Sequence, residues 1–373
     1  MRIGLLTMVF NNNYGGLLQA YALQWILKDQ GHQVVLINAQ RRLPPFFKAP
    51  LTMLRRLYLN RVHRVKFDSF IPEWAFPGRI RRKEKNTRSF ISEYIQPQTR
   101  MVFTNKGIKS AAQGFDAYVV GSDQVWRPDM YPFIESAFLG FVKGRKVKKL
   151  SYAASFGNAK WAFTEEQTRR FKQQILDFDG VSVREESGAD LCRKHFKVDA
   201  VRVLDPTFLL GKEHYCSLIP KEEINSINPE LFCYVLDESE EKRYVSGCLA
   251  VKLGLRADSF FVGKKDRGFV YPTVTSWLAS FYNAKFVFTD SFHGCVFSIL
   301  FNKPFFVFGN KIRGLDRFTS LLKIFQLEDR LILAPEQVSR LDPYSDIDWV
   351  MVNERLRQEV KASFGFLENI INH

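Results

Sequence analysis

The chain has 373 residues, of which 46% are hydrophobic and 25% charged, and its formal net charge is +15 at pH 7. This balance excludes wholesale disorder, and the length exceeds what one core of ordinary size needs, so we expect two domains. No apolar run reaches the roughly 18 residues that a membrane-spanning helix requires. The five Cys are scattered without a CxxC pair, which argues against a disulfide scaffold and fits a reducing cytoplasm.

The first 40 residues predict a strand, a helix and a second strand. Residues 3–10 form a short apolar run, residues 11–16 are a polar turn, and residues 17–30 have apolar positions in helical spacing. Gly31 stands where a helix commonly ends, and residues 33–37 read as the next strand. This βαβ pattern predicts a parallel sheet with helices on both faces.

The positive charge is concentrated between Arg41 and Arg88, where 14 Lys and Arg residues accompany 3 acidic residues. Apolar side chains there recur at intervals of three and four residues and predict a helix near residues 50–66. These apolar residues are Leu51, Leu54, Tyr58, Val62 and Val65, and the flanking basic residues are Arg55, Arg56, Arg61, Arg64 and Lys66.

Two interpretations of this basic helix stay open. It can lie on an anionic membrane surface with its apolar residues inward, or it can pack on its own domain with a solvated basic back. We do not expect nucleic-acid binding, because no recognition module accompanies the charge.

Further strands are predicted at residues 116–120, 150–154, 180–183 and 201–204, and each is followed by a polar or Gly-rich turn. Ligands of open α/β sheets bind at this edge. Residues 221–229 read as a linker, and a second α/β unit follows from residue 232. We therefore predict a Rossmann-like domain over residues 1–225, another over residues 230–347, and a terminal helix over residues 348–373 that packs back on the first domain.

The stretch from residue 288 to 298 has the richest chemistry. A strand ends at Thr289, Asp290 and Ser291, and His293 with Gly294 opens a helix. Backbone N–H groups at a helix start, next to hydroxyls and an imidazole, suit an anion site with an acid or base in reach. The alternative is that Asp290 or Ser291 only caps the helix while His293 fills a corner.

Two turns of the first domain are further candidates. Asp123 lies just past a predicted strand, where it orients or deprotonates a hydroxyl group or merely caps the next turn. Residues 13–16 resemble a phosphate-cradling loop, but they lack the GxGxxG pattern and a ribose-binding acid, so a dinucleotide site is poorly supported. No DxD pattern is present, and we expect no metal.

Several blocks occur in the order typical of one family. Residues 13–24, 121–126, 182–185, 205–207 and 289–308 together resemble the polysaccharide pyruvyl transferases, and the resemblance runs to about residue 333. It implies two Rossmann-like domains facing a cleft, as in GT-B glycosyltransferases. It also implies transfer of the enolpyruvyl group of phosphoenolpyruvate to two sugar hydroxyls, which gives a cyclic ketal.

The resemblance also implies roles for single residues. His293 is the catalytic or donor-binding histidine, with Ser291 and Phe292 beside it, and Arg184 binds the donor's charges. One branch of the family carries Arg at the position of Ser291, so Arg313 and Arg317 are expected to supply that charge, unless they lie on an exposed loop. The first domain is expected to bind the acceptor through Asn13, Tyr14, Gly15, Gly16, Ser122 and Asp123, with Asp123 also catalytic.

The sequence thus predicts a pyruvyl transferase acting on a hexose of a bacterial surface polysaccharide, such as an exopolysaccharide or capsule, or on its lipid-diphosphate-linked precursor. Phosphoenolpyruvate is the co-substrate and no other cofactor is expected. The predicted location is the inner face of the cytoplasmic membrane. One alternative is a nucleotide-sugar glycosyltransferase with Glu238 or Glu240 binding the ribose, and a second is a non-catalytic membrane-surface scaffold.

Overall fold

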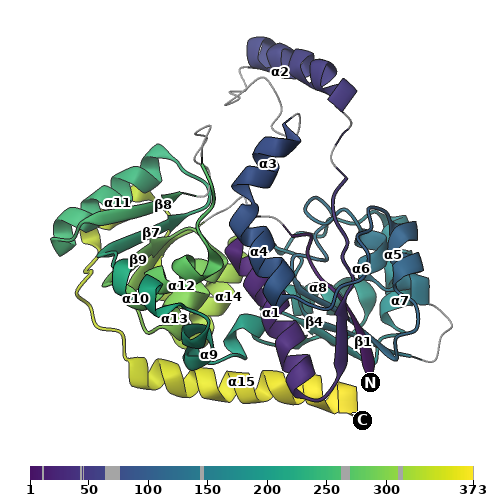
Figure 1. The fold of residues 1–373 in the computed structure, drawn as a ribbon. Coiled ribbons are helices and arrows are strands. Elements are labelled where there is room, and N and C mark those ends of the chain that lie inside the picture. The colour runs from purple at the N-terminus through teal and green to yellow at the C-terminus, as the bar shows by residue number, and fades with distance from the viewer. Residues whose placement is uncertain are drawn as a thin grey trace.

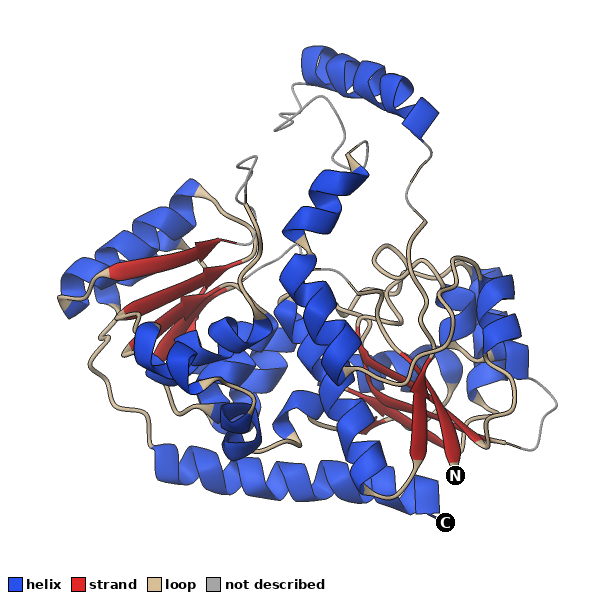
Figure 2. Cartoon of the chain, viewed as in Figure 1, coloured by secondary structure: helices blue, strands red, loops and turns tan. Residues whose placement is uncertain are grey.

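The structure is a computed structural model that describes residues 1–10, 12–42, 44, 46–63, 76–142, 147–261, 269–309 and 314–372. Two parallel sheets lie on opposite sides of the molecule, each with helices packed against it (Figures 1 and 2). The two chain ends meet at the first domain, because the last helix runs back along the base of the molecule.

The first sheet has six parallel strands in the order β2-β1-β3-β4-β5-β6. The strands are β1 (Arg2–Leu6), β2 (Gln33–Leu36), β3 (Ala117–Asp123), β4 (Lys148–Ala154), β5 (Gly180–Val183) and β6 (Val201–Arg202). The order reverses between β1 and β3. A crevice between carboxyl ends at such a reversal is the usual ligand position in an open α/β sheet.

The second sheet has five parallel strands in the order β11-β10-β9-β7-β8. The strands are β7 (Leu231–Val235), β8 (Ala257–Phe261), β9 (Phe286–Thr289), β10 (Phe305–Phe308) and β11 (Leu331–Ile332). Its order reverses between β7 and β9, so this domain has a second crevice of the same kind.

The helices that precede β7 in the chain are α1 (Tyr14–Asp29), α2 (Ala49–His63), α3 (Pro77–Lys83), α4 (Lys85–Tyr94), α5 (Asn105–Ala111), α6 (Ile134–Ala137), α7 (Glu165–Ile175), α8 (Glu186–Leu191), α9 (Lys212–Ser217) and α10 (Lys221–Ser226), of which α9 and α10 pack on the second domain. Those that follow are α11 (Glu240–Leu253), α12 (Val274–Asn283), α13 (Phe292–Leu300), α14 (Asp316–Phe325) and α15 (Trp349–Asn372). Short turns of tighter or wider helix include η5 (Pro206–Phe208).

Three local predictions differ from the structure. The first strand ends at Leu6, so Thr7 to Phe10 leave the sheet as a loop. Residues 121–123, expected as a turn, extend β3, because Gly121 and Asp123 pair with Tyr152 and Ala154 of β4. The expected linker at residues 221–226 is helical, as α10.

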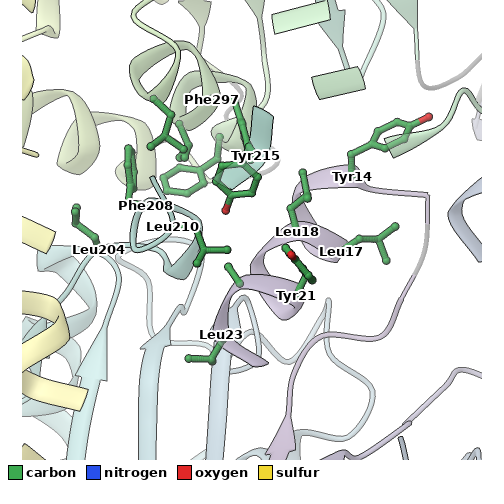
Figure 3. Close-up of a cluster of buried hydrophobic side chains, with 14 of the residues drawn as sticks. Tyr14, Leu17, Leu18, Tyr21, Leu23, Leu204, Phe208, Leu210, Tyr215 and Phe297 are labelled. Carbon is green, nitrogen blue, oxygen red and sulfur yellow. The ribbon is translucent and has the colours of Figure 1, made fainter. Parts of the chain in front are cut away.

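One continuous hydrophobic core joins the two domains. Figure 3 shows side chains of α1 and of the segment from Leu204 to Tyr215 gathered with Phe297 of α13. The rings of Tyr215 and Phe297 lie 4.9 Å apart at a steep angle. Tyr14 stacks on Trp277 of α12 at 5.6 Å, and its hydroxyl donates to the carbonyl of Pro272 at 2.9 Å. Because α1 packs on elements of both domains, it holds them against each other.

The terminal helix α15 connects the domains a second time. It runs from the second domain to the first along one side of the molecule (Figure 1). Arg202 pairs with Glu359 at 2.7 Å, the Leu204 N–H donates to Ser363 Oγ at 2.9 Å, and Lys148 Nζ donates to the carbonyl of Ile370 at 3.0 Å.

Candidate active site between the two domains

Three charged residues meet at the carboxyl edge of the first sheet. Asp123 ends β3, Arg184 directly follows β5, and Asp205 caps η5. Arg184 donates from Nη2 to Asp123 Oδ1 at 3.0 Å and from Nη1 to Asp205 Oδ2 at 2.7 Å. The side chains of Arg184 and Asp205 are 2% and 0% exposed, so the pairing takes place away from water. A buried guanidinium with two carboxylate partners is held rigidly, and its charge is balanced by these partners instead of by water.

The second domain contributes His293 in the first turn of α13. This helix follows β9 at the carboxyl edge of the second sheet, and Ser291 caps it by accepting the Gly294 N–H at 3.3 Å. His293 Nε2 lies 3.6 Å from Asp205 Oδ2, across the domain boundary. The imidazole ring therefore faces the carboxylate that Arg184 already contacts.

His293 also packs directly on the backbone of α1. A Cβ atom added to Gly15 would stand 2.0 Å from His293 Cγ, a separation that real atoms do not show. Only glycine permits this approach, so Gly15 lets the first helix of one domain reach the catalytic candidate of the other.

Phe292 and Arg317 complete the cluster from the second domain. The guanidinium of Arg184 lies 4.3 Å from the centre of the Phe292 ring, and that of Arg317, in α14, lies 5.5 Å from the same ring. Arg317 Nη1 stands 3.9 Å from Asp123 Oδ1. Asp123, Arg184, Asp205, His293 and Arg317 are named the interdomain cluster below.

The electrostatics of the interdomain cluster follow from burial and from its paired charges. Burial alone would raise the pKa of Asp123, but Arg184, His293 and Arg317 outweigh this effect and lower it. Burial opposes ionisation of Asp205 as well, yet His293 and Arg184 hold its pKa far below the ordinary value. Burial, together with repulsion from Arg184, lowers the pKa of Arg317 to about 10. Both aspartates are thus ionised at neutral pH.

Glu185 lies next to the interdomain cluster, but its carboxylate accepts hydrogen bonds from the loop that follows β4. Its Oε1 accepts from Ser155 Oγ at 2.8 Å and from the Phe156 N–H at 3.0 Å. Burial raises its pKa despite the nearby Arg184. Glu185 therefore fixes the loop after β4, which contacts α14 of the other domain where the Ala159 N–H donates to Asp316 Oδ2 at 2.6 Å.

Asp290 spans the crevice of the second sheet. Its carboxylate accepts from the Leu236 N–H at 2.6 Å, from the Asp237 N–H at 3.1 Å and from Lys242 Nζ at 2.7 Å. Asp290 thereby joins the end of β9 to the loop after β7, and we assign it a structural role at this edge of the sheet.

The structure brings several predicted site residues together and leaves others apart. Asp123, Arg184, His293 and Arg317 belong to the interdomain cluster, with Phe292 and Gly15 in contact with it and Ser122 Oγ donating to Asp205 Oδ2 at 3.2 Å. Asn13 precedes the first turn of α1 and Gly16 lies within it, while Tyr14 faces α12. Ser291 caps α13. Arg313 lies outside the described residues.

Asp205 and Glu185 were not predicted as site residues, although both lie in blocks that resembled the family. The signal for Asp205 was its position after a predicted strand, in Asp205-Pro206-Thr207. Its contact with His293 joins residues 88 positions apart and cannot be read from spacing.

The chemistry available at the interdomain cluster is proton transfer and anion binding. An imidazole facing an ionised carboxylate can carry a proton, and the two guanidinium groups beside Phe292 are suited to a small anion. Among the described residues, no group of three or more His, Cys, Asp and Glu side chains is arranged to hold a metal ion.

Comparisons with known proteins bear on both fold and family. The family model for polysaccharide pyruvyl transferases matches residues 13–312. No curated protein sequence matches the chain. Among solved structures, the UDP-GlcNAc 2-epimerase of Neisseria meningitidis, bound to UDP-GlcNAc, is similar with a TM-score of 0.56 and 11% identity, over 100% of both chains. A putative UDP-N-acetylglucosamine 2-epimerase of Listeria monocytogenes has a TM-score of 0.53 and 11% identity, over 100% of this chain and 98% of its own.

At this identity, the solved structures show the fold alone, and they confirm the prediction of two Rossmann-like domains. The family model covers most of the chain and confirms the resemblance drawn from the ordered blocks.

Proposed function

The chain belongs to the polysaccharide pyruvyl transferase family, and we propose that it transfers the enolpyruvyl group of phosphoenolpyruvate to two hydroxyls of one hexose, forming a cyclic ketal. The hexose is part of a bacterial surface polysaccharide or of its lipid-linked precursor. The observation that carries this proposal is the meeting of His293 with Asp205 across the domain boundary, beside Arg184 and Arg317.

The proposed donor needs cations, because it carries a carboxylate and a phosphate on three carbons. Arg184 and Arg317 both lie close to the Phe292 ring, and their mutual repulsion adds to the effect of burial in lowering the pKa of Arg317. An anion between two such groups relieves that repulsion. Because both terminal nitrogens of the Arg184 guanidinium donate to aspartates, we propose that Arg184 contributes positive charge and orients the two aspartates, while Arg317 contacts the donor.

In the proposed reaction, two sugar hydroxyls bond to C2 of phosphoenolpyruvate and one phosphate leaves it. C3 of the enol accepts a proton while a first sugar hydroxyl bonds to C2 and gives up its own proton. A second hydroxyl then bonds to C2 and gives up its proton, the C2–O bond to phosphate breaks, and inorganic phosphate leaves carrying that proton. His293 is the proposed acid or base of these steps, and Asp205 stabilises the charged imidazole.

The acceptor is proposed to enter from the first domain, where Asp123, Ser122 and the start of α1 with Asn13, Tyr14, Gly15 and Gly16 lie. Asp123 is ionised and belongs to the interdomain cluster, which supports a role in orienting an acceptor hydroxyl. No cofactor beyond phosphoenolpyruvate and no metal are part of this proposal.

A nucleotide-sugar glycosyltransferase is the rival proposal, and no specific contact favours it. Glu238, a candidate for binding the ribose, accepts from Arg243 Nε at 2.8 Å, and Glu240 opens α11. The crevice between β7 and β9 is crossed by the Asp290 hydrogen bonds.

The experiment that tests the main proposal measures phosphate released from phosphoenolpyruvate by purified protein, with and without candidate glycans. We expect glycan-dependent release and a pyruvylated product by mass spectrometry. Calorimetric titration provides the second measurement. Binding of a uridine or guanosine diphosphate without any saturable binding of phosphoenolpyruvate would contradict the pyruvyl transferase proposal.

We also propose that the protein works on the inner face of the cytoplasmic membrane and that α2 contacts anionic headgroups. Apolar residues of α2 are open to solvent, with Leu51 at 70%, Leu54 at 64% and Val62 at 56% exposure. Arg55 and Arg61 are exposed on the same helix, which stands away from both sheets (Figure 1). Val65, expected on the same face, lies outside the described residues, as do Arg64 and Lys66. No described helix is long and apolar enough to cross a bilayer.

A further inference from the structure

A large cleft opens in the first domain, separate from the interdomain cluster. Its volume is about 860 Å³, within the range of about 300–1,000 Å³ typical of small-molecule sites. Its walls are the loop after β1, helices α3 and α4, residues 96–103, and the turn at residues 129–130. In Figure 1 the helices α3 and α4 rise beside α1 between the two domains.

The cleft carries an excess of positive charge. Four arginines line it, namely Arg41, Arg42, Arg81 and Arg88. Its two acidic residues are already neutralised, since Glu84 pairs with Arg88 and Asp129 accepts from Arg127 Nε at 2.9 Å. Arg42 and Arg81 are exposed and make no ion pair with any residue in the described part of the chain. A ligand with one or two negative charges would balance them.

The rest of the lining favours a sugar. Five amide side chains contribute, Asn12, Asn38, Gln40, Gln96 and Gln98, of which Gln40 donates to Asn38 Oδ1 at 3.0 Å. Amides both donate and accept, and this matches the hydroxyl groups of a hexose. Apolar surface from Phe10 and Phe103 lies in the same walls, which suits the hydrophobic face of a sugar ring.

The cleft borders the segment that precedes α1. Residues 8–10 and Asn12 line the cleft, and the chain continues from Asn12 into the first turn of α1, where Gly15 contacts His293. Asn12 in the cleft wall is thus three residues from Gly15, which contacts the proposed acid or base.

We propose that this cleft binds the acceptor as a glycosyl phosphate ester, with its sugar against the amides and its phosphate between Arg42 and Arg81. This inference rests on the proposed function and deepens it, because it names a negatively charged class of acceptor. The phosphate comes either from a soluble sugar phosphate or from the diphosphate of a lipid carrier.

The test is a calorimetric titration of the whole protein without phosphoenolpyruvate. The probes are the 1-phosphates of glucose, galactose, mannose and N-acetylglucosamine, each paired with its neutral methyl glycoside. We expect at least one 1-phosphate to bind about tenfold or more tightly than its glycoside, as a charge-assisted hydrogen bond predicts. The double variant Arg42→Gln/Arg81→Gln should lose this preference.

The matched control is Arg82→Gln, which removes an exposed arginine of α3 that does not line the cleft. It should keep the preference for phosphate. Equal binding of every 1-phosphate and its glycoside by the wild type would overturn the inference, and this comparison needs no variant to fold. An equal loss in Arg82→Gln and in the double variant would overturn it as well, because the effect would then be one of net charge.

A second pair of probes identifies the source of the phosphate. Farnesyl diphosphate binding more tightly than inorganic diphosphate, with loss in the double variant, supports a lipid-linked acceptor, and equal binding of the two supports a soluble one. The proposed function can fail independently. Selective binding of a 1-phosphate by a protein that never releases phosphate from phosphoenolpyruvate keeps the cleft assignment and rejects the pyruvyl transfer.

Discussion

Arginine serves opposite purposes in two regions of this molecule. In the interdomain cluster, the side chain of Arg184 is 2% exposed and contacts two ionised aspartates. On α2, Arg55 and Arg61 face solvent next to exposed leucines. A buried charge depends on its partners within the fold, so one substitution should have a large effect. Exposed charges act additively and through an external partner, so they should have to be changed together.

The largest expected effect is on catalysis in the interdomain cluster. His293→Ala should lower turnover by roughly 10²–10⁴-fold, the usual range for loss of an acid or base. The measurement is the rate of phosphate release with a competent glycan. The control is His195→Ala, because His195 stacks on Trp161 away from the cluster and its loss should leave turnover unchanged. Turnover close to wild type in His293→Ala would remove this residue from the mechanism.

The next largest effect is on the stability of the protein, and it tests the buried arginine, Arg184. Arg184→Met leaves Asp123 and Asp205 without their shared cation and should lower the free energy of unfolding by roughly 3–5 kcal/mol. Arg184→Lys should cost less, because it keeps the charge and loses the fork. Arg193→Met is the exposed match, since Arg193 is 63% exposed and pairs with Asp190 and Asp199. It should cost less than about 1 kcal/mol in denaturant titration.

The same variants bear on the donor. If Arg184 also contributes to donor binding, phosphoenolpyruvate should bind Arg184→Lys more weakly than wild type and Arg184→Met more weakly still, while acceptor affinity stays nearly unchanged. Unchanged donor affinity in both variants, measured under conditions where each is folded, would restrict Arg184 to the pairing of the two aspartates. An equal loss of stability in Arg184→Met and Arg193→Met would contradict the difference drawn here between buried and exposed arginines.

The third prediction tests the exposed arginines of α2. Changing Arg55, Arg56 and Arg61 together to Glu should release the protein from anionic liposomes, because each basic residue near such a surface contributes about 1 kcal/mol. Activity on a short soluble acceptor should persist. The control changes Arg193, Lys194 and Lys197 to Glu, which alters net charge equally at another exposed site. If the wild-type protein does not bind anionic liposomes at low salt, α2 has no membrane role.

The smallest predicted effect sharpens the view of how the domains meet. Gly15→Ala should destabilise the protein by about 1–3 kcal/mol, because its new methyl group would overlap the His293 ring. Gly16→Ala is the matched control, since its methyl would stand 3.7 Å from Asn13, an ordinary contact. That variant should be neutral or more stable by up to about 1 kcal/mol, as alanine favours helices. Equal melting temperatures for the two variants would mean that α1 and α13 do not pack as described.

Much of the architecture was readable from local patterns. Apolar runs followed by helical spacing, as in residues 3–30, predict parallel strands joined by helices, because side-chain periodicity reflects local backbone geometry. The exact ends of the strands were not readable in this way. Residues 121–123 looked like a turn but extend β3, because pairing with β4 outweighs their local preference for a turn.

The ordered motifs of the sequence determined the family and the candidates His293, Arg184 and Asp123, since each lies where a strand meets a turn. Only the tertiary structure decided their partners. The fold gives Arg184 hydrogen bonds to Asp123 and Asp205, which lie 61 and 21 residues away along the chain. It also sets Gly15 against His293, from opposite domains. The physical reason is that parallel sheets collect the ends of distant strands at one edge, while spacing along the chain records only local geometry.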